Sequence, residues 1–109
     1  MFSLELSSDF ADDIGAHAVQ RLLEVCRHEG GGTRPIADFL VSLHNSSYAT
    51  VDAYQLCRRL DDEHFLDVVT VLRWFRDAPY RCDLQDIFVD GPRIMADLME
   101  RFDLNRHRG

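Results

Sequence analysis

The segment FLDVVTVLRWF, residues 65–75, is the most apolar stretch of the chain, with eight hydrophobic residues among its eleven. At about 100° per residue of an α-helix, most of these side chains share a roughly 160° arc. An arc of that width predicts a core-facing stripe on a central helix. The stripe consists of Phe65, Val68, Val69, Val71, Leu72 and Phe75.

A second strip on the same helix holds Leu66, Thr70 and Trp74, with Arg73 between the two strips. In one interpretation, further helices of a bundle cover this strip. In the other, Leu66 and Trp74 contact another protein or a second copy of the chain, because Trp and Arg are enriched in binding hot spots and two-fold homodimers are common. The candidate partner-binding residues are Leu66, Thr70, Arg73, Trp74, Asp61 and Asp62.

Helical spacing of apolar residues and capping signals recur along the rest of the chain. The expected helices run over about 9–28 with Ser7 or Ser8 as cap, from Thr33 to the HNSS segment at 44–47, from Thr50 or Asp52 to Leu60, from Asp61 or Asp62 to before Pro79, and from Asp90-Gly91-Pro92 to Phe102. The segment CDLQDIF at 82–88 predicts a short helix or turn. We therefore expect an all-α fold, a compact bundle of about five helices joined by short loops, in a single domain over residues 1–109.

The charge of the chain restricts its partners. All twelve basic residues are Arg, and the formal net charge is −7. This balance argues against direct binding of nucleic acid or of an anionic membrane surface, and it suits a basic protein partner. No apolar run approaches the ~20 residues of a membrane span, and the acidic start lacks the pattern of a signal peptide. We expect a cytoplasmic protein.

Motifs for catalysis, metals and cofactors are weak in this sequence. The cysteines Cys26, Cys57 and Cys82 are widely spaced, and Cys26-x-His28 is the nearest approach to a metal fragment. A structural zinc site requires four N or S ligands, usually in close pairs, so no metal or cofactor is expected. The enzymatic alternative is a thiol-dependent enzyme or redox protein that uses Cys57, with His64 nearby, or Cys26.

Many aspartates occur at the expected helix starts and loops. A solvated surface explains them, and so does a spaced array of carboxylates that imitates a phosphate backbone; the sequence leaves both open. The residues concerned are Asp9, Asp12, Asp13, Asp61, Asp62, Asp83, Asp86 and Asp90.

The block LLEVCRHEGGGTRPIADFL and the later helix end RWFRDAPY resemble a small uncharacterised family of bacterial helical domains, often carried on mobile elements. The resemblance extends from Leu22 to Phe102. It implies no known activity, but it implies a setting of accessory genes in which small acidic proteins act as inhibitors, including anti-CRISPR proteins. We therefore expect a small acidic non-enzymatic protein-binding module that inhibits a nucleic-acid-processing host complex, with a basic nucleic-acid-binding effector as its partner.

Overall fold

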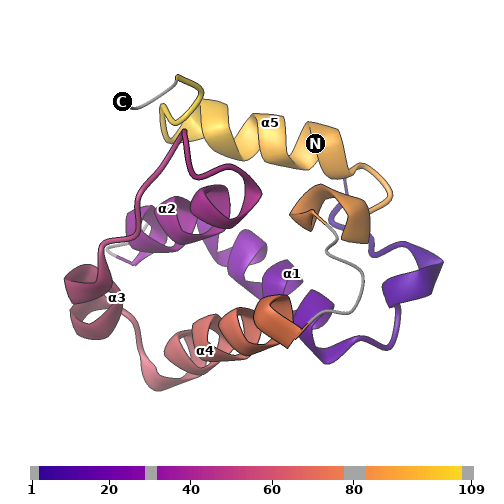
Figure 1. Ribbon diagram of the computed structural model, residues 1–109, viewed down its shortest axis with the longest axis horizontal. Helices are drawn as coiled ribbons and strands as arrows, with labels where there is room; N and C mark the ends of the chain where they lie inside the picture. The colour runs from indigo at the N-terminus through magenta and orange to yellow at the C-terminus, as the bar shows by residue number, and fades with distance from the viewer. Residues whose placement is uncertain (1–2, 29–31, 78–82, 107–109) are drawn as a thin grey trace.

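The computed structural model describes residues 3–28, 32–77 and 83–106. These residues form five α-helices and two short 3-10 helices, which confirms the prediction of an all-α bundle of about five helices (Figure 1). In chain order the elements are η1 (Ser8–Phe10), α1 (Ile14–Cys26), α2 (Thr33–His44), α3 (Ala53–Arg59), α4 (Asp62–Asp77), η2 (Leu84–Ile87) and α5 (Gly91–Arg101).

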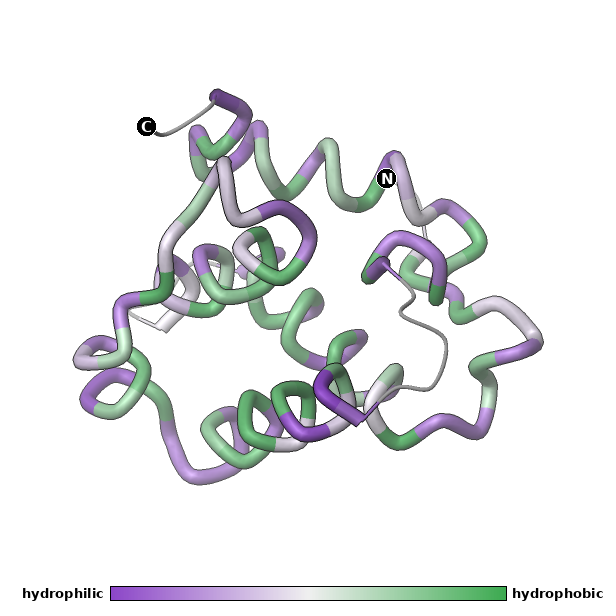
Figure 2. The backbone as a smooth tube through the Cα atoms, viewed as in Figure 1, coloured by the Kyte–Doolittle hydropathy of each residue, from purple (hydrophilic) through white to green (hydrophobic). Residues whose placement is uncertain are grey.

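The helices α1 and α2 form the middle of the bundle (Figure 1). α4 packs against α1, and α5 packs against α2 and η2, so α4 and α5 lie on opposite sides. The largest fully buried side chains include Leu22 of α1, Phe39 of α2 and Met95 of α5. Figure 2 shows that hydrophobic residues make up much of α4 as well as of α1. Within the described ranges, no helix combines the length and apolar character that a membrane span requires.

The first α-helix begins later than the sequence suggested. The expected helix from Asp9 to His28 is divided into η1 and α1, and Asp13 replaces Ser7 or Ser8 as the cap. The Asp13 side chain accepts hydrogen bonds from the amides of Gly15 and Ala16 at 2.9 and 3.1 Å. Several aspartates lie close together here, and the one whose carboxylate reaches two free amides sets the helix start.

The other helix boundaries follow the predicted signals more closely. Asp52 caps α3 by accepting from the amide of Gln55 at 3.1 Å, and Pro92 occupies the first turn of α5. α4 ends at Asp77, while Pro79, the expected stop, lies outside the described residues. A Cβ at Gly91 would lie 1.6 Å from the carbonyl oxygen of Gln85, so Gly91 lets the start of α5 approach η2 closely.

Candidate functional site

Trp74 sets one contact between α4 and α1. A Cβ at Gly15 would lie 1.9 Å from Cγ of Trp74, so the indole ring rests directly on the α1 backbone. Trp74 is half-buried, packs against the hydrophobic core and lies beside Phe75, with ring centroids 6.3 Å apart. Because its ring packs against α1, Trp74 contributes to the core contact between α1 and α4.

An ion pair between Arg21 of α1 and Asp67 of α4 sets a second contact. Nε and Nη2 of Arg21 donate to the two carboxylate oxygens of Asp67 at 3.0 and 2.8 Å. Asp67 is 6% exposed, and its hydrogen bonds raise the pKa of the Arg21 guanidinium. A buried carboxylate needs such a bidentate partner. The pair therefore fixes which face of α4 turns toward α1.

The face of α4 opposite these contacts is apolar and exposed to solvent. We call its four large side chains the α4 strip. They are Phe65, Leu66, Val69 and Leu72, with exposed fractions of 39%, 63%, 43% and 50%. On a helix these positions cluster about the direction of Val69. The strip is the largest set of exposed apolar side chains that one described helix presents.

The predicted orientation of α4 is partly wrong. Val68 and Val71 of the expected core stripe are buried, but Phe65, Val69 and Leu72 of the same stripe are exposed. The reason is that α4 packs mainly on one neighbour, α1, at the edge of the bundle. A single neighbouring helix covers a narrower arc of α4 than the roughly 160° over which its apolar residues are spread.

The six predicted partner-binding residues divide between two sides of α4. Leu66, Arg73 and Asp62 are exposed and share the outward side with the α4 strip. Thr70 is half-buried at its edge, and Trp74 faces α1. Asp61 is exposed, and its carboxylate accepts from the amide of His64 at 2.9 Å as a cap of α4. Contact of any of them with a partner stays a prediction.

Several of the aspartates that were candidates for a recognition surface have a local structural role. Asp13, Asp61 and Asp83 accept hydrogen bonds from backbone amides at helix starts. Asp86 completes a capping box at η2 by accepting from the amide of Asp83. Capping explains why aspartate recurs at these positions, and it supports the interpretation as a solvated, structural set.

The cysteines differ in their environments. Cys26 is buried, and loss of solvation raises the pKa of its thiol to about 12, which suppresses the reactive thiolate at neutral pH. Cys57 on α3 is exposed, while Cys82 lies outside the described residues. Nδ1 of His64 lies 3.0 Å from the carboxylate of Asp61. Among the described residues, no group of three His, Cys, Asp or Glu is arranged to hold a metal ion.

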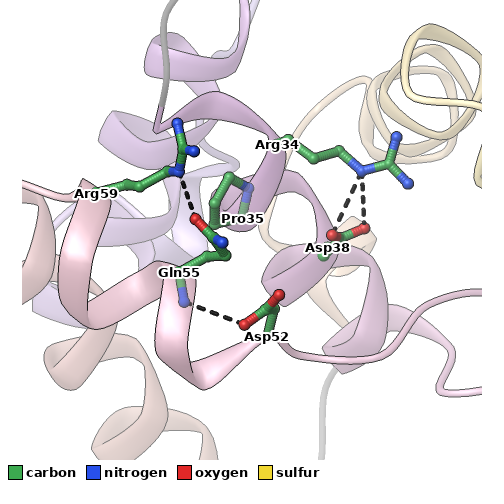
Figure 3. A pocket seen from close by; sticks show the side chains of 6 residues that line it. All are labelled: Arg34, Pro35, Asp38, Asp52, Gln55 and Arg59. Carbon is green, nitrogen blue, oxygen red and sulfur yellow. Dashed lines mark hydrogen bonds and ion pairs between the residues drawn. The ribbon is translucent and has the colours of Figure 1, made fainter.

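A hollow of about 260 Å³ lies between α2 and α3 (Figure 3). Its polar groups bind one another: Arg34 pairs with Asp38 at 3.3 Å, and Arg59 donates to the side chain of Gln55. Arg34 also donates to the carbonyl of Phe102 at 3.0 Å. Two arginines and two aspartates balance in charge, so the hollow attracts neither sign of ligand. Its lining residues are Arg34, Pro35, Asp38, Asp52, Gln55 and Arg59.

Comparison with known proteins places the chain in a family without adding a chemistry. No curated protein and no solved structure shows significant similarity to it. A family of unknown function (DUF7673) matches residues 16–103, about four-fifths of the chain, from the first turn of α1 to just beyond the end of α5. The matched region includes the whole α4 strip and the Arg21–Asp67 pair, and it begins one residue after Gly15. The chain is therefore a member of the DUF7673 family.

Proposed function

We propose that this chain is a non-enzymatic protein-binding module that uses the α4 strip as its contact surface. The observation that carries the proposal is the exposure of four large apolar side chains on one face of one helix. Single exposed apolar residues are ordinary on protein surfaces, but a contiguous group is typical of an interaction site. Spacing of i, i+4 and i+7 at Phe65, Val69 and Leu72 suits a partner that lies along the helix.

The rigid attachment of α4 supports this use of the strip. The Trp74–Gly15 contact and the Arg21–Asp67 pair hold the opposite face of the helix against α1. The strip is therefore presented to a partner without prior rearrangement. A surface that is already ordered loses less conformational entropy on binding.

The narrower form of the proposal is a cytoplasmic inhibitor of a nucleic-acid-processing complex, such as an anti-CRISPR protein from a mobile element. Its support is the net charge of −7 together with the resemblance of the helical block. A basic nucleic-acid-binding effector is the proposed partner, because opposite charges accelerate encounter. Asp61 and Asp62 lie at the N-terminal end of the strip, where they would face basic side chains.

Affinity capture from lysate with two matched variants tests the contact surface. Val69→Glu adds a carboxylate to the centre of the strip, and Val51→Glu adds one to the loop before α3, where Val51 is 46% exposed against 43% for Val69. Both changes alter net charge equally. We expect the native chain and Val51→Glu to retain the same protein, and Val69→Glu to lose it. If the native chain and both variants capture the same proteins, as identified by mass spectrometry, the proposal is contradicted.

The thiol-dependent alternative rests on Cys57, because burial and a raised pKa disfavour Cys26 as a nucleophile. Timed alkylation near pH 7, followed by peptide mapping, separates the two classes of function. A catalytic thiolate at Cys57 would be modified much faster than a free cysteine in the unfolded chain. We expect Cys57 to react no faster than a cysteine in the unfolded chain. Cys26, which is buried, should react only once the chain unfolds.

A further inference from the structure

The two ends of the α4 strip carry opposite charges. Asp62 lies at its N-terminal end, and Arg73 and Arg76 lie at its C-terminal end; all three are exposed. At 100° per residue, each falls within roughly 40° of Val69 around the helix axis. Val69 is seven residues, or about two turns, from both Asp62 and Arg76. The surface is therefore an apolar centre with an acid at one end and bases at the other.

We propose that the α4 strip binds the α4 strip of a second copy of this chain, with the two helices antiparallel about a two-fold axis beside Val69. This inference rests on the proposed function, because it gives the same surface a second binding partner; a dimer that dissociates leaves the strip free for the basic effector. The two-fold reverses the order of residues, so Asp62 of each copy lies level with Arg76 of the other. Phe65 then lies level with Arg73 of the second copy, and Leu66 lies level with Leu72.

The order of charges selects the antiparallel orientation. In a parallel pair with its two-fold along the helices, Asp62 would meet Asp62 and Arg76 would meet Arg76, and like charges at both ends would repel. The antiparallel pair replaces both repulsions with attractions and also opposes the two helix dipoles. A surface with this order of acid, apolar centre and base is complementary to itself when turned end for end. This is the requirement of an isologous interface.

Two effects act against the dimer. Each copy has a net charge of −7, but at about 0.15 M salt the screening length is about 8 Å, so charges away from the interface contribute little. Arg76 already pairs with Asp77 of its own chain, with Nε 2.9 Å from the carboxylate. That pair is exposed and therefore weak, and a guanidinium has further N–H groups for a second carboxylate.

The size of the surface indicates a weak, reversible dimer. α4 has sixteen residues, and one face of it supplies fewer than the 20–30 residues that each side of a standard interface contributes. Small interfaces are typical of transient complexes. We therefore expect a dissociation constant on the order of tens of micromolar, a free energy of about −6 kcal/mol by the conversion of dissociation constants.

Sedimentation equilibrium of the full chain at about 0.15 M salt tests this pairing. We expect the native chain to pass from monomer to dimer across the micromolar range. Asp62→Arg and Arg76→Asp should each weaken self-association roughly tenfold, since each places two like-charged pairs at the ends of its own dimer. An equimolar mixture of the two variants should recover the native affinity, because the introduced Arg of one then faces the introduced Asp of the other.

The mixing experiment distinguishes the proposed pairing from a loss of folding, since two unfolded or weakened variants would not restore each other. Arg106→Asp, an exposed position outside α4, is the charge-matched control and should leave the affinity unchanged. A native chain that stays monomeric up to about 1 mM, far above the expected dissociation constant, overturns the dimer. So does a mixture that associates no better than its components. In either case, loss of a captured protein on Val69→Glu would still support the proposed function.

Discussion

The helices α4 and α5 lie on opposite sides of the bundle and differ in what they leave exposed (Figure 1). The large apolar residues of α5 are buried, and its outward positions are charged, small or proline. Those outward residues are Pro92, Arg93, Ala96, Glu100 and Arg101. α4 instead exposes Phe65, Leu66, Val69 and Leu72. The fold of one chain therefore buries all the large apolar side chains of α5, whereas it leaves four of those of α4 exposed.

The number of neighbours accounts for the difference. α5 packs against both α2 and η2, so two elements bury its apolar face, while α4 packs mainly against α1. α4 has an apolar residue at most positions around its circumference between Phe65 and Phe75. One helical neighbour cannot cover that circumference. An apolar face without a neighbour is therefore a property of the fold, and the folding free energy should depend little on it.

The largest loss of stability is expected for a truncation in the buried face of α5. Leu98 is 3% exposed and Leu66 is 63% exposed. We expect Leu98→Ala to lower the free energy of unfolding by about 2–5 kcal/mol, because it leaves a cavity. Leu66→Ala should change it by about 0.5 kcal/mol or less, since the side chain is largely hydrated already. Urea unfolding followed by circular dichroism at low micromolar concentration measures both, and equal losses would contradict the comparison.

A smaller effect is expected where α4 meets α1. Gly15→Ala should cost about 1–3 kcal/mol in unfolding free energy, because the new methyl group would overlap Trp74. In a Trp74→Ala background the same change should cost about 0.5 kcal/mol or less, so the two changes are coupled. Thermal or urea unfolding of the four proteins in this cycle gives the coupling energy.

Gly32→Ala is the matched control for that cycle. A Cβ at Gly32 would lie 3.5 Å from the carbonyl oxygen of Arg59, which is ordinary contact. We expect a loss below about 1 kcal/mol there, from the modest preference for Gly over Ala at an N-cap. An additive cycle at Gly15 and Trp74 would show that the indole ring does not rest on α1 in solution.

Local signals predicted the helices because their causes are local. The Asp52 cap and Pro92 at the start of α5 each depend on residues a few positions away, and both were anticipated. Where several aspartates competed, at the start of α1, the predicted cap was wrong. The length of α4 was also anticipated, because the hydrophobic run and the acidic start delimit it.

The orientation of α4 was not predictable by the same means. The helix carries apolar residues on two faces, and the choice between them is made by Gly15 and Arg21, which are far from α4 in sequence. Leu66, Arg73 and Asp62 of the proposed contact surface were identified from the sequence, whereas Phe65, Val69 and Leu72 were assigned to the core. The burial of Asp67 depends on Arg21, a partner 46 residues away that helical periodicity does not reveal.

The smallest of the three main losses of stability concerns the ion pair that orients α4. Arg21→Met leaves the carboxylate of Asp67 buried without its bidentate donor, but Arg21 is itself 53% exposed, so water can replace part of the interaction. We expect a loss of about 1–2 kcal/mol in unfolding free energy. Adding Asp67→Leu should recover most of the lost stability, because an apolar pair needs no buried donor.

Arg101→Met is the control on the α5 side. Arg101 donates an exposed hydrogen bond to the carbonyl of Arg27 at 3.2 Å, and we expect its loss to cost under about 0.5 kcal/mol in unfolding free energy. Urea unfolding of the three variants decides the point: if Arg21→Met and Arg101→Met cost the same, the Arg21–Asp67 pair does not fix the face that α4 turns toward α1.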